Sequence, residues 1–261
     1  WNTGADFSAD IPPIATPADV KAMRATLKGR LIAWDPKSQS VRWSVEHNNA
    51  WNGGVLSTAG GLVFQGKLNG EFAAYNAATG APLWSYNVLA GAASGPATYS
   101  INGEQYITIT TGWGSAYGLT SGLAYDQKVL SSVGKVVTFK LGATGAISPP
   151  DMPPIDRNAK ADSFGDDNMI ADGTEAFARN CAVCHGALAI SSGVLPDLRW
   201  SAMTANAQAW RSVVLGGALA SNGMVSFAKY LNDEDAEAIR AYVLKQAHTD
   251  MQGRAEEATT P

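Results

Sequence analysis

Two stretches of the chain repeat each other 41 residues apart, and this repeat constrains the fold more than any other feature. Residues 33–43 (AWDPKSQSVRW) align with residues 74–84 (AYNAATGAPLW). In each copy a strand ends at Asp or Asn, a turn follows, and a tryptophan opens the next strand. A period of roughly 40–50 residues with a tryptophan and turn residues is typical of β-propeller blades. The repeat therefore predicts propeller blades of short antiparallel strands.

Further strands are predicted around this repeat. Residues 61–66 and 71–75 form a predicted hairpin across residues 67–70, and residues 105–111 and 133–139 have the composition of strands. These segments amount to about three blades, whereas a propeller closes with ~4–8 blades and eight of this period need about 330 residues. We therefore expect a partial propeller, from a chain that is either a piece of something longer or one half of a split protein.

The only two cysteines of the chain lie in one short motif, Cys181-Ala182-Val183-Cys184-His185. The pattern C-x-x-C-H is an attachment site for a c-type haem. One turn of backbone places both sulfurs beneath the two vinyl groups of the ring, and the histidine that follows is aimed at the iron. Zinc is a weaker interpretation, because no second Cys/His pair supplies the remaining ligands. A thioredoxin-like site is weaker still, because no βαβ pattern surrounds the motif.

The flanks of this motif predict two helices. A helix capped by Asp172 or Thr174 leads into Cys181, with Phe177 on its apolar side. A second helix begins at residues 233–235, and apolar residues then recur with a period of about 3.6 residues. These apolar positions are Ala236, Ile239, Tyr242, Val243 and Ala247. Two helices that cross near the attachment loop are usual in a c-type cytochrome.

A second axial ligand must come from the other face of the ring. The candidates are Met203, Met224, Met251 and His248. Met224 follows a Gly-rich loop, residues 216–223, in which a flexible thioether can lie over the ring without a colliding helix. We therefore predict His185 and Met224 as the axial pair, which raises the reduction potential and suits electron transfer. His47 and His248 are predicted to be ordinary packing or surface residues.

The composition divides the chain into four parts. Residues 1–141 are predicted to be propeller blades, and residues 142–170, which include a Pro-Pro-Asp-Met-Pro-Pro run, a semi-rigid linker. Residues 171–250 are predicted to be the cytochrome domain, and residues 251–261 a disordered tail. The predicted fold class is mainly β plus α: a partial β-propeller followed by an α-helical c-type cytochrome domain.

Charge and hydropathy exclude several classes of protein. The net charge is −4, with 19 basic and 23 acidic residues, so the chain lacks the basic surface that a nucleic-acid-binding protein needs. No run of ~18 apolar residues occurs, so no membrane span is expected. Apolar residues make up 46% and charged residues 16%, which favours a folded core over disorder.

A propeller with tryptophan repeats, a Pro-rich linker and a haem c motif, in this order, strongly resembles the quinohaemoprotein alcohol dehydrogenases. These are periplasmic enzymes that use pyrroloquinoline quinone (PQQ). In the propeller the resemblance rests on residues 1–6, 51–54, 58–66 and 112–118; in the cytochrome it rests on residues 181–186, 195–199 and the Met224 loop. It covers nearly the whole chain and implies the C-terminal blades of an eight-bladed propeller.

The same resemblance implies roles for individual residues. Trp51 and Asn52 would lie against the carboxylate and carbonyl edge of PQQ, and the backbone N–H of Ala116 would contact the rim of the quinone. Trp51 as core packing and Asn52 as a turn residue are the structural alternatives. Pro196 would accept a hydrogen bond from His185 and so orient it, and Arg199 would pair with a haem propionate.

The repeat tryptophans are predicted to have no chemical role. Trp43 and Trp84 are expected to pack one blade against the next. The family's catalytic Asp, its calcium ligands and its vicinal disulfide are expected in earlier blades, because no adjacent cysteines and no assignable acidic pair occur here.

Three functions follow as hypotheses. The first is the C-terminal part of a PQQ- and haem c-dependent alcohol dehydrogenase that also needs Ca²⁺. The second is a dehydrogenase of the same family that acts at a non-alcohol carbon, such as an alkaloid hydroxylase. The third is an electron-transfer cytochrome whose propeller fragment is not catalytic.

The expected partners follow from the first hypothesis. They are the N-terminal part of the propeller, a small-molecule substrate, and a soluble redox acceptor such as a copper protein or a cytochrome. Covalent haem attachment takes place outside the bacterial cytoplasm, so we expect the periplasm. The lack of a visible signal peptide does not oppose export.

Overall fold

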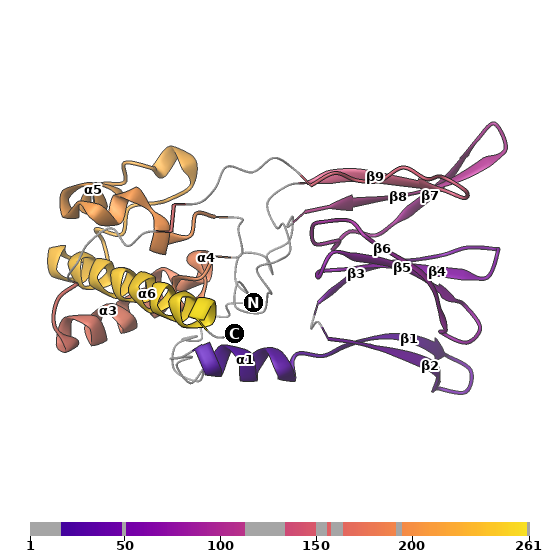
Figure 1. Ribbon diagram of the computed structural model, residues 1–261, viewed down its shortest axis with the longest axis horizontal. Coiled ribbons are helices and arrows are strands. Elements are labelled where there is room, and N and C mark those ends of the chain that lie inside the picture. Colours follow the sequence, from indigo (N-terminus) through magenta and orange to yellow (C-terminus); the bar gives the residue numbers. More distant parts are fainter. Residues whose placement is uncertain are drawn as a thin grey trace. The chain divides into compact units, whose positions relative to one another are not determined.

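The computed structural model describes residues 17–48, 51–112, 134–149, 156–157, 164–191 and 195–259. The described residues form two compact units, residues 17–149 (the propeller unit) and residues 156–259 (the cytochrome unit), and the division between them falls at Met152/Pro153, inside the predicted linker. The first unit contains the sheets and the second contains most of the helices (Figure 1). This division matches the predicted fold class, a β-sheet part followed by a helical part.

The described residues of the propeller unit form three antiparallel sheets, and helix α1 (Pro17–Thr26), which the sequence did not predict, precedes them. The first sheet pairs β1 (Gly29–Asp35) with β2 (Ser40–His47). The second contains, in spatial order, β3 (Asn52–Ser57), β4 (Leu62–Lys67), β5 (Glu71–Asn76) and β6 (Pro82–Asn87). The third contains β7 (Ala97–Ile101), β8 (Glu104–Thr111) and β9 (Lys135–Lys140). The predicted hairpin, now β4–β5, and the two predicted strands, now β8 and β9, are confirmed.

The 41-residue repeat is confirmed, and both copies have a β-bulge at the equivalent position. The β1–β2 pair has a bulge after Ala33, and the β5–β6 pair has one after Ala74. In the first turn the Asp35 carboxylate accepts from the backbone N–H groups of residues 37 and 38. In the second turn the Asn76 side chain accepts from residues 78 and 79. Short Asp and Asn side chains cap such turns, which is why these residue types recur at this position.

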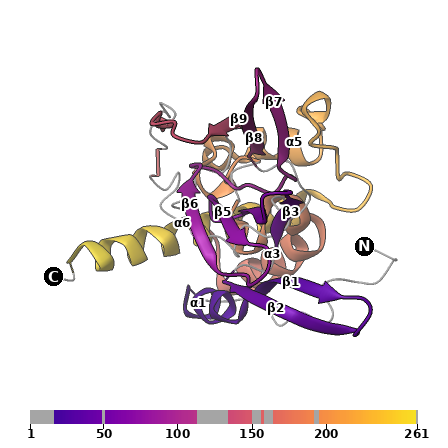
Figure 2. The ribbon, with the colours of Figure 1, turned by 90° about the vertical axis from the view of Figure 1, so that its right-hand side faces the viewer.

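The three sheets lie one above another (Figure 2), and two apolar cores join them. In β5, Phe72 and Ala74 pack in one core with Ile109 and Val137 of the third sheet. The intervening residues Ala73 and Tyr75 pack in another core with Leu31 of the first sheet. Because successive side chains of a strand point to opposite faces, the central sheet is apolar on both sides.

The repeat tryptophans join neighbouring sheets, as predicted. The indole N–H of Trp43 donates to the carbonyl of Ala77 at 3.0 Å, in the turn of the next sheet. Gly80 of that turn has φ +75°, and a Cβ there would lie 2.6 Å from the Trp43 ring. Trp84 contacts the third sheet at a strand rather than at a turn: its ring lies edge-on to Phe139 of β9, with 5.2 Å between ring centroids.

In the described part of the cytochrome unit, short helices surround two longer ones. These are α3 (Asp167–Asn180), α4 (Ala182–His185), η2 (Ala187–Ala189), η3 (Leu198–Trp200), η4 (Ala202–Ala205), α5 (Ala207–Val214), η5 (Ala220–Asn222) and α6 (Asp233–Thr259). Among the described residues, no helix is both long enough and apolar enough to cross a membrane.

Helices α3 and α6 cross in close contact at Gly173. A Cβ on Gly173 would lie 2.0 Å from the carbonyl oxygen of Ala238, so only glycine permits this approach. Phe177 and Tyr242 pack beside the crossing with tilted rings, 5.1 Å between ring centroids. The five apolar positions predicted for the second helix, residues 236, 239, 242, 243 and 247, are all buried. The prediction of two crossing helices is therefore confirmed.

Three predicted boundaries in this unit are wrong. Helix α3 begins at Asp167, capped by the Asp166 side chain, which accepts from the N–H of Met169 at 2.9 Å. Neither Asp172 nor Thr174 is the cap, and the predicted linker to residue 170 includes the first turn of this helix. Helix α6 continues to Thr259 through the predicted tail, because the residues after Gly253 favour helix and Arg254 pairs with Asp250 one turn earlier.

We expect Gly173→Ala to lower the free energy of unfolding of the cytochrome unit by about 2 kcal/mol, because α3 and α6 must separate to admit the methyl group. Helical circular dichroism during urea unfolding measures this change. The matched control is Gly253→Ala in α6, where a Cβ meets nothing within 4 Å. The control should gain about 1 kcal/mol from helix propensity. Equal losses in both variants would contradict the role of Gly173 in the crossing.

Candidate functional site

The CxxCH motif forms a single helical turn directly after α3. The carbonyl of Cys181 accepts from the N–H of Cys184 at 3.1 Å and from that of His185 at 2.9 Å. Both cysteines are free thiols; Cys181 is buried and Cys184 is exposed. Burial, with a smaller contribution from Cys184, raises the pKa of Cys181 to about 12, so this thiol is protonated at neutral pH. The turn therefore holds two thiols and an imidazole at adjacent positions.

The imidazole of His185 is buried and oriented by the carbonyl of Pro196, as the resemblance implied. Its Nδ1 lies 3.4 Å from that oxygen. Burial lowers the pKa of His185, which favours the neutral ring. A neutral ring with its proton on Nδ1 leaves Nε2 as an electron-pair donor, the state that a metal-ligating histidine requires.

Arg199 lies nearby with its guanidinium buried and held by two carboxylates. It donates to both oxygens of Asp197, at 2.9 and 2.7 Å, and to Asp250 of α6 at 2.9 Å. Burial acts to lower the pKa of Arg199, but the two carboxylates outweigh it and raise that pKa. The sequence did not predict either carboxylate partner. The predicted contact with a haem propionate stays a prediction, and a propionate would share the guanidinium with both carboxylates.

Met224 follows Gly223, the left-handed residue that ends η5. Its side chain is half-buried, and its N–H donates to the carbonyl of Leu219 at 3.2 Å. Of the other candidates, Met203 is 40% exposed in η4, and His248 in α6 contacts the ring of Phe164. Met251 lies inside α6 rather than in a tail. Only Met224 lies on an irregular loop, so it remains our predicted axial ligand.

These residues fit a haem better than a metal ion held by protein ligands. Within the described ranges, no group of three or more His, Cys, Asp or Glu side chains could hold a metal ion. The zinc interpretation therefore has no ligand set among these residues. Two cysteine thiols and a neutral, oriented imidazole in one turn suit a covalently attached haem, because the thiols would add to its vinyl groups as thioethers and the imidazole would bind the iron.

On the propeller unit, the predicted PQQ residues Trp51 and Asn52 lie at the start of β3. Trp51 is 47% exposed and Asn52 opposes Lys67 of β4. A Cβ on Gly53 or Gly66 would lie within 2.5 Å of the Ala92 carbonyl, so the backbone is packed tightly behind this end of the sheet. An exposed indole beside an amide suits a flat ring that bears carboxylates, so these residues fit PQQ. Ala116 lies outside the described residues.

A buried polar contact between His47 and Gln65 lies behind this end of β3, and the sequence did not predict this contact. The Nε2 of His47 lies 3.0 Å from Oε1 of Gln65, whose amide donates to the Gly53 carbonyl at 3.1 Å. Lys67 pairs with Glu71 at 3.0 Å and lies beside the Tyr75 ring. Burial lowers the pKa of His47, which favours the neutral ring. His47 is thus buried and hydrogen-bonded, and its predicted role as an ordinary packing or surface residue stays a prediction.

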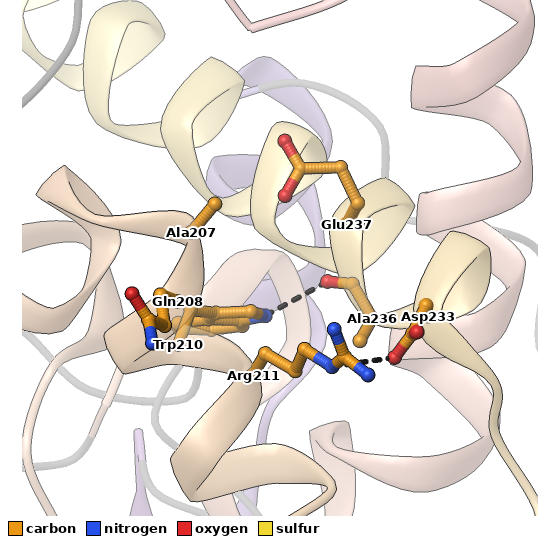
Figure 3. Close-up of a pocket in the computed structure, with 7 residues that line it drawn as sticks. All are labelled: Ala207, Gln208, Trp210, Arg211, Asp233, Ala236 and Glu237. Carbon is orange, nitrogen blue, oxygen red and sulfur yellow. Dashed lines mark hydrogen bonds and ion pairs between the residues drawn. The ribbon is translucent and has the colours of Figure 1, made fainter.

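A pocket between α5 and the start of α6 contains none of the predicted site residues (Figure 3). The Trp210 indole forms part of it and donates to the carbonyl of Ala236 at 2.8 Å. An exposed ion pair joins Arg211 to Asp233 at 2.7 Å. These contacts join α5 to α6, so we assign this pocket to the packing of the helices.

Two family models match the chain, one in each unit. Residues 29–107 match the β-propeller domain of glucose/ethanol/alcohol dehydrogenases, the PQQ family model. Residues 168–243 match subunit III of cbb3-type cytochrome c oxidase. The matches support a PQQ-type propeller and a cytochrome c unit, in agreement with the predicted cofactors PQQ and haem c. They do not test calcium.

Curated relatives match along nearly the whole chain. The dehydrogenase subunit of a quinone alcohol dehydrogenase from Komagataeibacter europaeus is 38% identical over 97% of this chain. Quinohaemoprotein alcohol dehydrogenase ADH IIB of Pseudomonas putida is 36% identical over the same share. The solved structure of ADHIIG from Pseudomonas putida HK5 superposes with a TM-score of 0.80, at 37% identity over 89% of this chain.

By sequence and by fold, this chain is similar to part of the quinohaemoprotein alcohol dehydrogenases. It spans about a third of the relatives that it matches: 34% of the Komagataeibacter subunit, 36% of ADH IIB and 34% of the solved ADHIIG chain. The resemblance inferred from the motifs is therefore confirmed.

We expect Met224→Leu to remove the His/Met signature from the visible spectrum of the haem and to lower its reduction potential, because a thioether ligand raises that potential. A drop of about 60 mV or more corresponds to a tenfold change in a one-electron equilibrium. The matched control is Met203→Leu, which should change neither property. A loss of the signature in the Met203 variant instead would show that the axial ligand is misassigned.

Proposed function

We propose that the chain is part of a PQQ- and haem c-dependent alcohol dehydrogenase. The complete enzyme would oxidise an alcohol or a similar small organic substrate and pass the electrons through the haem to an external acceptor. The observation that carries this proposal is the presence, in one chain, of a PQQ-type propeller and a CxxCH turn whose histidine is oriented by Pro196.

In the proposed enzyme, the residues of each unit would hold one of the two cofactors. When bound, PQQ supplies two-electron oxidation and the haem supplies one-electron transfer. Cys181 and Cys184 would hold the haem as thioethers, with His185 and Met224 as iron ligands. Trp51, Asn52 and the backbone of Ala116 would hold one edge of PQQ. The catalytic Asp and the calcium ligands are expected in blades outside this chain.

The cellular setting belongs to the same proposal. Covalent haem attachment outside the cytoplasm and the related dehydrogenases support a periplasmic enzyme. The acceptor would be a soluble copper protein or cytochrome that takes one electron at a time.

The propeller partner has specific support in the first sheet. Ile32 and Trp34 of β1 are 40% and 57% exposed, whereas the residues 41 positions later, Ala73 and Tyr75, are each 2% exposed. Ala73 and Tyr75 are covered by the preceding sheet. By the same register, Ile32 and Trp34 would be covered by a preceding blade. An exposed apolar face of this kind marks an interface.

We expect Trp34→Glu to destabilise the complete protein by about 3 kcal/mol, because it places a charge in a blade interface. Thermal unfolding of the complete protein measures this loss. The matched control is Tyr230→Glu in the cytochrome unit, an aromatic residue that is 68% exposed, and it should have little effect. Equally small losses of stability in both variants would exclude a blade packed against Trp34.

The activity is tested by adding a primary alcohol to the complete protein loaded with PQQ and Ca²⁺. We expect the absorption bands of the reduced haem to appear, and a preparation without PQQ should give no such reduction. If PQQ binds and dithionite reduces the haem but alcohols do not, the alcohol dehydrogenase proposal fails. Reduction by a heterocyclic amine instead would indicate the hydroxylase, and failure to bind PQQ would leave the electron-transfer cytochrome.

A further inference from the structure

We propose that Asp250 of α6 is a positioning residue for the haem-ligating histidine, acting through Arg199 and the segment that carries the Pro196 carbonyl. This inference rests on the haem part of the proposed function. It assigns a role to a residue 65 positions beyond His185, which the attachment motif does not contain.

The contacts form a continuous path from α6 to the imidazole. Asp250 Oδ1 accepts from Arg199 Nη1 at 2.9 Å, and Arg199 also donates to both carboxylate oxygens of Asp197. Asp197 also accepts from the backbone N–H of Arg199 at 3.1 Å and so caps η3. Its preceding residue, Pro196, presents its carbonyl to Nδ1 of His185.

The segment that carries this carbonyl is not held by regular secondary structure. Residues 195–197 lie in neither a helix nor a strand, and η3 is a single turn of three residues. Helix α6 is the rigid partner, because its Ala238 and Tyr242 pack against Gly173 of α3 in the core. Arg199 is 3% exposed, so its ion pairs are shielded from solvent. The Arg199–Asp250 bond therefore ties the irregular segment to the core.

A small displacement of the segment would matter at the histidine. The distance from Nδ1 to the Pro196 oxygen is 3.4 Å, at the long end for a hydrogen bond. A carbonyl that accepts from Nδ1–H increases the electron donation of the ligating nitrogen. If the carbonyl moves away, that donation weakens, the oxidised haem loses stabilisation, and the reduction potential rises.

Charge alone is the competing explanation, and three substitutions separate it from position. Asp250→Ala removes both the hydrogen bond from Arg199 and the negative charge. Asp250→Asn removes the charge but keeps an oxygen that Arg199 can donate to. Arg254→Ala removes the exposed ion pair on the other oxygen of Asp250 and leaves the contact with Arg199 in place.

The experiment is a potentiometric titration of the haem in the complete holoprotein, followed by visible absorbance. We expect Asp250→Ala to raise the potential by an amount that corresponds to about a tenfold change in the one-electron equilibrium, or about 59 mV. Asp250→Asn should recover most of the wild-type value, and Arg254→Ala should match the wild type. Urea unfolding of each variant accompanies the titration, because a loss of stability alone would leave the potential unchanged.

Two results would overturn the inference. Equal shifts in the Ala and Asn variants would mean that the charge of Asp250 acts and not its position, and an unchanged potential in both would mean that Asp250 only stabilises the fold. If the wild-type chain carries no covalent haem, the proposed haem function fails instead, so the two failures are distinguishable.

Discussion

The close crossing of α3 and α6 at Gly173 is the constraint on which the cytochrome unit depends. It places the end of α3, where Cys181 begins the attachment turn, on a helix that is fixed to the core. It also fixes α6, which supplies Ile239 and Val243 to that core and Asp250 to the buried guanidinium. A haem pocket needs rigid walls on separate parts of the chain, and two helices in van der Waals contact supply them.

The propeller unit depends on a different constraint, the alternation of side chains along its strands. Because Ala73 and Tyr75 face one neighbouring sheet and Phe72 and Ala74 face the other, each sheet must be covered on both sides. Tryptophan docking onto the next turn sets the spacing between sheets, as Trp43 does over Gly80. Among the described residues, these three sheets leave Ile32 and Trp34 of β1 exposed, and this exposure supports the proposed further blades.

The two units fit one chemical purpose in the proposed enzyme. An organic cofactor that takes two electrons needs a second redox centre that accepts them one at a time, and a haem c is such a centre. In the proposed enzyme, groups near the iron, such as the Pro196 carbonyl, would set the reduction potential of the haem. Arg199 shows how such a group can be held: a planar guanidinium reaches two carboxylates at once.

The sequence alone determined the repeat, the attachment motif and their order along the chain. These are local patterns: a turn capped by Asp35 or Asn76, a tryptophan at a fixed offset, and two cysteines and a histidine within one helical turn. The Pro196 contact and the family followed from a resemblance carried by those patterns. Helix ends were less predictable, because α3 begins at a cap that competes with nearby Asp and Thr residues, and α6 continues past Gly253 once its first turns are packed.

Only the tertiary structure decided which distant residues meet. Arg199 and Asp250 are 51 positions apart, and nothing in the local sequence of either identifies the other. The same is true of His47 and Gln65 behind the start of β3, and of Gly173 beneath Ala238. The physical reason is that a buried charge or a missing Cβ is explained only by the group packed against it, and packing joins residues that the order of the chain keeps apart.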